Sequence, residues 1–338
     1  MEIARRAKVA GGKVARRFAS NGLILMYHRV AHPDTDPWGL CVTAEHFAEQ
    51  LQVLKDNFNI VALRDLGRAL RNRRIADRTI AISFDDGYAD NFHNALPQLD
   101  ANGLPATIFI STGNLARERE FWWDELEQIL LNDRLLPERL TLVTRDGERT
   151  WHVTPGDYSE SLKSKRAWEG EPGTRVALFH DIWKTMLCMP SDEQDSVIDQ
   201  LVDLSESPPT LRPSHRSLTE QEIHTLAQHR LIDIGAHTVS HPLLTAHSEM
   251  FQRREIEDSK AQLEDLTGTK ISCFAYPFGD HSESSVRLTH KAGFECACTT
   301  VENTVWRFSD PYRMPRLAVE DWDGDQFAKQ LHRLLGRR

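Results

Sequence analysis

Apolar runs of five or six residues alternate along the chain with segments that place an apolar residue at every third or fourth position. The runs at 23–27, 79–84 and 106–110 contain no charged residue, which is typical of strands buried on both faces of a sheet. Further strands are expected near 60–62, 231–234, 271–276 and 295–299. Helices are expected near 43–54, 66–70, 89–102, 219–229, 250–266 and 283–292. Strands that alternate with helices form parallel βα units, so we predict an α/β fold.

The alternation breaks between residues 117 and 217. Helices near 122–131, 176–187 and 193–204 and a hairpin at 140–153 are expected within this block. The hairpin prediction depends on Asp146-Gly147, a dipeptide typical of tight turns between strands. We therefore expect three regions: a basic leader at 1–22, a domain at 23–338, and an inserted helical and hairpin subdomain at 117–217 of that domain.

Polar side chains follow several predicted strands directly. Asp85 and Asp86 come after the buried run 79–84, and His237 and His241 come after the run 231–234. Four positions is about one helical turn, so both imidazoles are expected to face one point. One carboxylate and two imidazoles form a three-ligand catalytic zinc set that leaves a position for water. The second carboxylate then suits the base that deprotonates this water, so the sequence indicates a metal-dependent hydrolase.

The carboxylate pair and the histidine pair each have an ordinary structural explanation when they are taken alone. An Asp-Gly pair such as Asp86-Gly87 usually marks a turn. Two histidines at this spacing are more often structural or exposed than metal ligands. However, two ionised carboxylates at the end of a buried strand are costly unless a cation or hydrogen bonds compensate them. The combination therefore favours the metal site.

The composition of the chain limits the classes of protein and of binding partner that we expect. The net charge of -9 argues against a nucleic-acid partner, because such proteins favour a basic face. The five cysteines are scattered, and we expect them to be buried, reduced thiols in a reducing compartment. No apolar run approaches the roughly 18 residues of a membrane span, and no signal peptide is recognisable, so we expect a cytoplasmic location. The basic leader would allow peripheral contact with an anionic membrane, but a solvated, partly frayed helix is the preferred explanation.

Three short segments resemble the motifs of a known protein family. They are 83–87 (SFDDG), 237–241 (HTVSH) and 274–279 (FAYPFG), and the segment 26–30 (MYHRV) adds to them. In this order they resemble the polysaccharide deacetylases of carbohydrate esterase family 4, over roughly 23–115 and 216–320. The run 121–124 (FWWD) is similar to a subset linked to polysaccharide biosynthesis. The resemblance implies an irregular (β/α)7 barrel.

The resemblance also implies roles for the site residues. Asp85 would be the general base, and the ligands of one divalent ion, with zinc as the default, would be Asp86, His237 and His241. The backbone N–H of Phe278 would stabilise the oxyanion of the tetrahedral intermediate.

The chain departs from the family pattern at two places. Many members have an arginine where this chain has Ala275, and we expect Arg316 to orient Asp85 instead; the alternative is a surface salt bridge. The usual C-terminal histidine motif is also missing, since Leu331-His332 lies in a charged, peripheral helix. We predict that the strand order is circularly permuted and that His28 protonates the leaving amine. The alternative for His28 is a core histidine bonded to a loop carbonyl.

The predicted activity is removal of acetyl from an N-acetylated sugar, in a biosynthetic precursor such as a lipid-linked or nucleotide-linked saccharide. Trp38 is the preferred aromatic wall for the sugar ring, ahead of Trp122 or Trp123. Two alternatives keep the same residues: hydrolysis of a non-sugar C–N bond, such as a purine ring or cyclic imide, and a catalytically silent glycan-binding protein.

Overall fold

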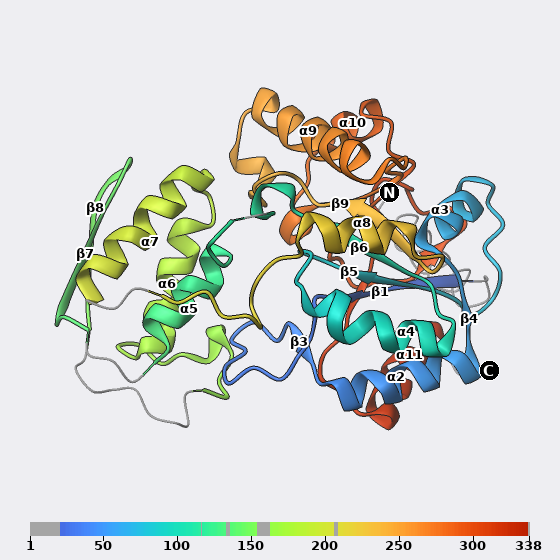
Figure 1. The fold of residues 1–338 in the computed structure, drawn as a ribbon, viewed down its shortest axis with the longest axis horizontal. Helices are drawn as coiled ribbons and strands as arrows, with labels where there is room; N and C mark the ends of the chain where they lie inside the picture. Colours follow the sequence, from blue (N-terminus) through green and yellow to red (C-terminus); the bar gives the residue numbers. More distant parts are fainter. Residues whose placement is uncertain (1–20, 116, 133–135, 154–162, 206–208, 337–338) are drawn as a thin grey trace, which may run out of the picture.

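The computed structural model describes residues 21–115, 117–132, 136–153, 163–205 and 209–336. The predicted basic leader therefore lies outside the described residues, apart from Asn21 and Gly22, which begin the first strand. The described chain forms two lobes (Figure 1). The larger lobe is a curled sheet covered by helices, and the smaller lobe is built by the predicted insertion.

The larger lobe is organised by one sheet in which the strands follow the order β11-β10-β9-β6-β5-β1-β12. Its strands are β1 (Asn21–Tyr27), β4 (Asn59–Ile60), β5 (Thr79–Phe84), β6 (Ala106–Ile110), β9 (Ile232–Ala236), β10 (Cys273–Ala275), β11 (Cys296–Cys298), β12 (Val305–Trp306) and β13 (Leu317–Ala318). Neighbours from β11 to β1 run parallel, as the βα pattern predicts. The predicted strands 79–84 and 106–110 match β5 and β6 residue for residue, because both are mainly apolar runs without a charged residue, and every residue is buried.

One segment near the C-terminus joins the two edges of this parallel sheet. On one side, the Met314 N–H donates to the Ala297 carbonyl at 2.9 Å, and the Thr299 N–H donates to the Met314 carbonyl at 2.9 Å. On the other side, β13 pairs in parallel with β1, and the Val319 N–H donates to the Met26 carbonyl at 3.0 Å. The segment completes an irregular (β/α)7 barrel, the fold class expected from the sequence.

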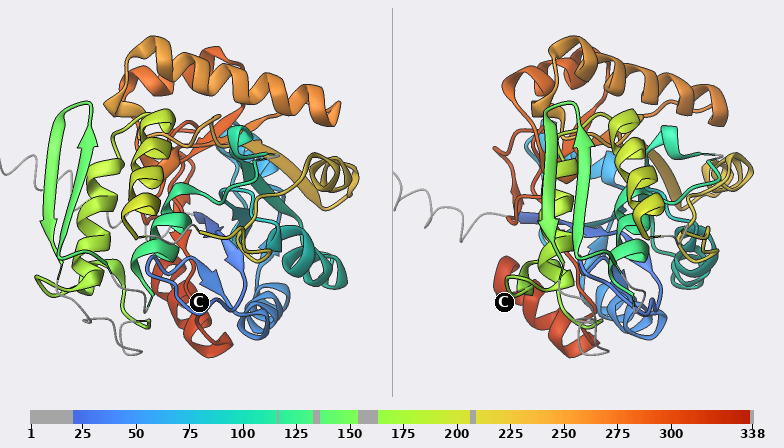
Figure 2. Two further views of the ribbon diagram at one scale, coloured as in Figure 1. Left: turned by 60° about the vertical axis from the view of Figure 1, so that its left-hand side comes forward. Right: turned by 90° about the vertical axis from the view of Figure 1, so that its left-hand side faces the viewer.

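Helices surround the barrel (Figure 2). They are α2 (Ala44–Asn57), α3 (Leu63–Arg71), α4 (Leu96–Asn102), α8 (Glu220–Gln228), α9 (Glu249–Thr267), α10 (Glu283–Lys291) and α11 (Gly324–Leu335). The expected capping box of α8 is present, since Thr219 and Glu222 each accept from the other's backbone N–H. The helix expected at 89–102 differs at its start, where a π-helical turn at Asn91–Ala95 precedes α4. His332 lies in α11, which packs against α2.

The insertion forms a lobe with its own core. Its elements are α5 (Trp122–Leu130), β7 (Arg139–Thr144), β8 (Gly147–His152), α6 (Arg175–Met186) and α7 (Ser191–Ser205). Leu126, Phe179 and Ile198, one from each helix, belong to one buried cluster that is separate from the barrel core. Tyr88, which follows β5, belongs to this cluster as well. The insertion is therefore anchored beside the strand that carries the paired carboxylates.

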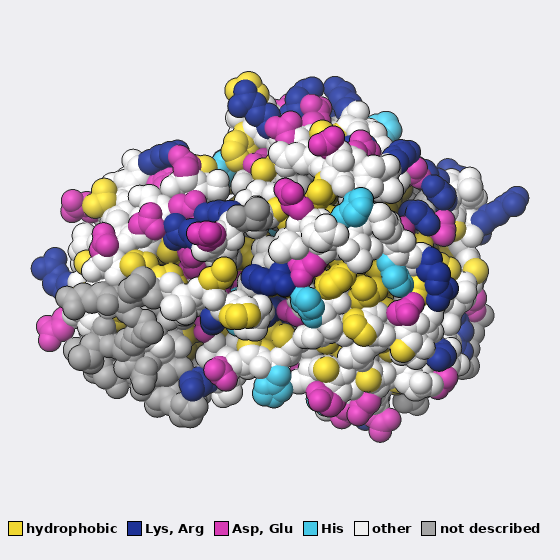
Figure 3. Space-filling model, in the orientation of Figure 1, with side chains coloured by type: hydrophobic (Ala, Val, Ile, Leu, Met, Phe, Trp, Pro, Cys, Tyr) yellow, Lys and Arg dark blue, Asp and Glu magenta, His cyan; other side chains and the backbone are white. Residues whose placement is uncertain are grey.

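Charged side chains of both signs are interspersed on the face shown in Figure 3. Within the described residues, no helix combines the length and the apolar character that a membrane span requires. The expectation of buried cysteines is wrong for Cys188, which is exposed after the end of α6; the other four are buried. Cys273 and Cys296 are neighbours on β10 and β11, with 3.5 Å between their Sγ atoms, and both are free thiols.

Candidate active site

The paired carboxylates lie at the carboxyl end of β5. Asp85 and Asp86 are 2% and 4% exposed, and the Asp85 N–H continues the sheet by donating to the Tyr27 carbonyl at 3.0 Å. The chain then turns sharply, because Asp86 and Gly87 both have positive φ (71° and 76°). This turn allows two adjacent carboxylates to serve different partners.

Asp86 faces the two predicted imidazoles. Its Oδ1 lies 3.5 Å from Nε2 of His237 and 3.3 Å from Nε2 of His241, and the three candidate ligand atoms lie within 4.8 Å of one another. Nδ1 of His237 is 2.7 Å from the Ala275 carbonyl, which fixes the proton on Nδ1 and leaves Nε2 as a ligand. Burial raises the pKa of Asp86, but hydrogen bonds with both imidazoles outweigh it and hold the pKa well below the usual value. The donor set, an ionised carboxylate and two imidazoles, fits one divalent cation.

The two imidazoles converge by a different route from the one expected. Residues 237–241 are not helical; β9 ends at Ala236, and a tight loop follows. Thr238 and His241 have positive φ (66° and 56°), and the His241 N–H donates to Thr238 Oγ1 at 3.1 Å. The prediction of a helical turn was therefore wrong. The backbone reverses within the loop, and this reversal brings both rings to Asp86.

A buried carboxylate on α9 holds this loop. Glu255 is 7% exposed and accepts hydrogen bonds from the Val239 N–H, the Ser240 N–H and the Ser240 hydroxyl at 2.8–2.9 Å. These donors lie between the two histidines. Glu255 therefore positions the loop that carries the two candidate metal-ligand histidines, a role that the sequence did not reveal.

We expect Glu255→Gln to weaken zinc binding about tenfold, the usual cost of losing an outer hydrogen-bond partner of a metal site. The amide retains one acceptor oxygen but places an NH2 group against a loop donor. Competition titration with a chromophoric chelator measures the zinc affinity directly. Glu257→Gln is the matched control, because this carboxylate is 43% exposed on the same helix. Equal zinc affinities for the two variants would contradict the role of Glu255.

Arg316 forms a buried, bidentate ion pair with Asp85. Its two terminal nitrogens lie 2.7 Å from Oδ1 and Oδ2, and its Nε donates to the Thr299 carbonyl at 2.9 Å. The guanidinium is fully buried, so the alternative of a surface salt bridge does not apply. Burial raises the pKa of Asp85, but the Arg316 charge and hydrogen bonds outweigh it and hold the pKa below the usual value. Arg316 reaches this position because it lies in the segment that closes the barrel.

His28 lies at the carboxyl end of β1, the strand paired with β5. It is half-buried and lines the same pocket as Asp85 and Asp86. Its imidazole has no hydrogen bond to any residue that the structure describes, so a core histidine bonded to a loop carbonyl is not what is found. Phe278 lies across the pocket and, like His28, contributes to its lining.

Backbone strain is concentrated at this site. Six non-glycine residues of the described chain have positive φ, and four of them are Asp86, Thr238, His241 and Phe278. Each such conformation costs about 1–3 kcal/mol unless the surroundings compensate it. The strain lies where the loops converge, which supports this pocket as the candidate functional site independently of the residue types.

The pocket has a volume of about 240 Å³ and an aromatic wall. The wall consists of Trp38, Trp123, Trp183 and Phe278. Trp38, the preferred wall residue, lies in it, 4.4 Å from Trp183 between ring centroids. Trp123 contacts the His241 ring at 4.9 Å, whereas Trp122 does not line the pocket. Trp183 was not predicted, since only the fold of the insertion brings α6 to this pocket.

A buried hydrogen-bond chain fixes Trp123. Its indole N–H donates to the Tyr88 hydroxyl at 2.9 Å, and this hydroxyl donates to Asp124 at 2.7 Å. Burial raises the pKa of Asp124 to about 8. These hydrogen bonds connect the insertion to Tyr88, the residue that follows Asp85-Asp86-Gly87, so both lobes shape one pocket.

Comparison with known proteins agrees with this geometry. The sequence profile of the polysaccharide deacetylase family matches residues 72–135 and 198–297. A Bacillus subtilis (strain 168) protein, YxkH, named as a polysaccharide deacetylase, is 19% identical over 298 residues, which cover 88% of this chain and 70% of that relative.

Solved structures share the fold. The Streptococcus pyogenes deacetylase PplD, in complex with acetate, aligns with a TM-score of 0.58 and 18% identity, covering 92% of this chain and 98% of that one. The Bacillus cereus polysaccharide deacetylase BC0361 aligns with a TM-score of 0.57 and 18% identity, covering 93% and 70%. At these identities the likeness shows a common architecture.

Proposed function

We propose that the chain is a divalent-metal-dependent hydrolase that removes acetyl from an N-acetylated sugar unit, in line with the match of residues 72–135 and 198–297 to the polysaccharide deacetylase family. The observation that carries this proposal is that two adjacent carboxylates at the end of β5 have different partners. Asp85 is held ionised by Arg316, while its neighbour Asp86 faces two imidazoles in a metal-binding arrangement.

Asp86, His237 and His241 would hold the cation, with zinc as the default. When bound, a divalent cation lowers the pKa of water at its open position and polarises the acetyl carbonyl. Asp85 supplies the base: Arg316 binds one side of the carboxylate, and its remaining lone pairs accept the proton of the attacking water. The Phe278 N–H then donates to the oxygen that gains negative charge as water adds to the carbonyl carbon.

His28 would complete the reaction as the acid. The bond between the carbonyl carbon and the sugar nitrogen breaks, the nitrogen takes a proton from the His28 imidazole, and acetate and a free amino sugar result. Trp38 and Trp183 offer apolar faces to the sugar ring and the acetyl methyl. We further propose a lipid-linked or nucleotide-linked biosynthetic saccharide as substrate and a cytoplasmic location.

The direct test is acetate release from a panel of N-acetylated saccharides by metal-stripped and zinc-restored protein. We expect release only after a divalent cation is restored. The panel includes small cyclic amides as controls. Hydrolysis of these amides without acetate release from any saccharide would favour a non-sugar amidohydrolase, and a protein that binds no divalent cation would overturn the mechanism.

A further inference from the structure

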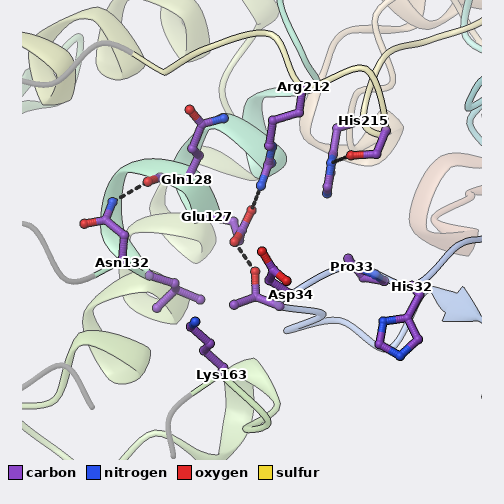
Figure 4. Close-up of a pocket in the computed structure, with 12 residues that line it drawn as sticks. His32, Pro33, Asp34, Glu127, Gln128, Asn132, Lys163, Arg212 and His215 are labelled. Carbon is purple, nitrogen blue, oxygen red and sulfur yellow. Dashed lines mark hydrogen bonds and ion pairs between the residues drawn. The ribbon is translucent and has the colours of Figure 1, made fainter. Parts of the chain in front are cut away.

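A second cavity, of about 400 Å³, lies where the insertion meets the larger lobe (Figure 4). Three segments line it: helix α5, residues 212–215, and the loop at 32–35 between β2 (Arg29–Val30) and β3 (Cys41–Val42). Residues 212–218 lead from the insertion to α8, and we call them the return segment. Figure 4 shows Arg212 of the return segment and Glu127 of α5 facing each other, joined by an ion pair. The contacts of this arginine extend from the cavity toward the catalytic pocket.

Arg212 holds the start of α5 at three points. Its two terminal nitrogens lie 2.7 Å from a Glu127 oxygen and 2.7 Å from a Glu120 oxygen. One of them also donates to the Asp124 carbonyl at 3.2 Å. These three positions span about two helical turns, so the contacts restrict both the rotation and the translation of α5. The side chains of Glu120 and Glu127 are 1% and 8% exposed, and Arg212 compensates their buried charges.

The return segment is itself fixed to the turn after the paired carboxylates. The Leu218 N–H donates to the Gly87 carbonyl at 2.9 Å, and the Ala89 N–H donates to the Arg216 carbonyl at 3.0 Å. Gly87 directly follows the candidate metal ligand at the end of β5, so the return segment pairs with the chain as it leaves the candidate metal site. Arg212 therefore connects α5 to a segment that is anchored beside this site.

A second buried cation ties the return segment to the larger lobe. Arg29 is buried; its Nε lies 3.0 Å from Asp90, and a terminal nitrogen donates to the Ser214 carbonyl. The guanidinium also lies over the Tyr88 ring, 4.6 Å from the ring centroid. The Tyr88 hydroxyl accepts from the Trp123 indole N–H, so these contacts continue to the wall of the catalytic pocket.

The contacts of Arg212 flank the residues that build this wall. Phe121 and Trp123 lie between two of them, at positions 120 and 124. The Trp123 ring stacks on Phe121, with 4.5 Å between ring centroids, and lies 4.9 Å from the His241 ring. A shift of α5 would therefore move the wall relative to the candidate metal site.

We propose that Arg212 is a positioning residue of the catalytic pocket: it fixes α5 to the return segment and thereby places Trp123 against His241. This inference rests on the proposed deacetylase function, because it explains how the insertion shapes the pocket that holds the sugar. Arg212 lines the second cavity, whereas Trp123 lines the catalytic pocket. Arg212 therefore acts through Trp123 rather than by contact with the substrate.

The first test follows Trp123 itself by fluorine NMR. The protein is labelled with fluorotryptophan, and the Trp123 signal is assigned among the eight tryptophans with Trp123→Phe. The difference in chemical shift between H2O and D2O reports the exposure of the ring. Trp123 is 5% exposed, so we expect a small difference in the unaltered protein and a larger one in Arg212→Gln. Glu127→Gln keeps the size of the side chain, removes one ion pair and should act in the same direction.

Two controls separate positioning from general destabilisation. Arg117→Gln removes an ion pair of similar exposure, 2.9 Å long, between Arg117 and Asp195 on α7, and should leave the Trp123 signal unchanged. Trp151, on β8 of the same lobe, should keep its signal in Arg212→Gln. An unchanged Trp123 signal in both Arg212→Gln and Glu127→Gln, or an equal change at Trp151, would overturn the proposal.

Kinetics connect the position of Trp123 with the reaction. On the preferred N-acetylated saccharide, Arg212→Gln should raise KM about five- to tenfold and change kcat little, because the wall binds the sugar and takes no part in proton transfer. Arg117→Gln should change neither constant, and a loss of kcat at unchanged KM would contradict the role of Arg212. If the unaltered protein releases no acetate, the fluorine signals still decide the placement of Trp123. A selective change in Arg212→Gln would then support the positioning by Arg212 and overturn only the proposed function.

Discussion

Asp85→Asn is expected to lower kcat about 10²–10⁴-fold, the usual contribution of a positioned general base. Asparagine keeps the size of the side chain and accepts one hydrogen bond from Arg316, but it cannot take a proton from water. The cation ligands remain, so zinc should still bind one to one. The measurement is acetate release under saturating saccharide, with zinc content determined on the same sample.

The pH dependence of the activity of the unaltered protein gives a second test of the role of Asp85. Its pKa lies below the ordinary 3.8, because Arg316 outweighs burial. Asp85 therefore stays ionised above about pH 5, and any loss of activity between pH 5 and 7 must come from another group.

Glu257→Gln serves as a surface control with unchanged kcat. A variant Asp85→Asn that retains more than a tenth of kcat would exclude Asp85 as the base.

Arg316→Met is expected to lower the free energy of unfolding by about 3–5 kcal/mol, because it leaves the buried Asp85 carboxylate without its cation. The double variant Arg316→Met/Asp85→Asn removes both charges and should recover much of this stability while remaining inactive. Urea denaturation of the single and double variants measures the coupling between the two residues.

The control for Arg316 lies three residues earlier. Arg313 pairs with Asp310 and Glu283 but is 30% exposed, so Arg313→Met should cost about 1 kcal/mol or less. Because the folded-state pKa of Asp85 is lowered, the stability of the pair is present above pH 3.8 and is lost as pH falls through the folded-state pKa. The difference between Arg316→Met and the unaltered protein should therefore shrink at low pH. Equal costs for the two arginine variants at pH 7 would show that Arg316 is not a buried structural cation.

The barrel strands were predictable because their signal is local. Strands β5 and β6 are apolar runs buried on both faces, so composition alone marks them. Strand β13 was missed because it has two residues, and its place between the sheet edges depends on hydrogen bonds to strands far away in the chain. Cys188 was misjudged for a similar reason, since its exposure follows from the end of α6 rather than from its type.

The local structure of the insertion was predictable from the sequence, but its contribution to the site was not. Its helices and hairpin follow from periodicity and from the Asp146-Gly147 turn. Its contribution to the pocket does not, because Trp183 meets Trp38 only after α6 packs on the loop that carries Trp38.

The sequence by itself determined the α/β class, the positions of the main parallel strands along the chain and the residue types of the candidate metal-binding set. It did so because apolar runs and the strand-end motifs are short-range features. The tertiary structure decided how those residues act: the left-handed loop that aims His237 and His241 at Asp86, and the ion pair between Arg316 and Asp85. These features depend on backbone reversal and on contacts across 231 positions of the chain, which no local periodicity encodes.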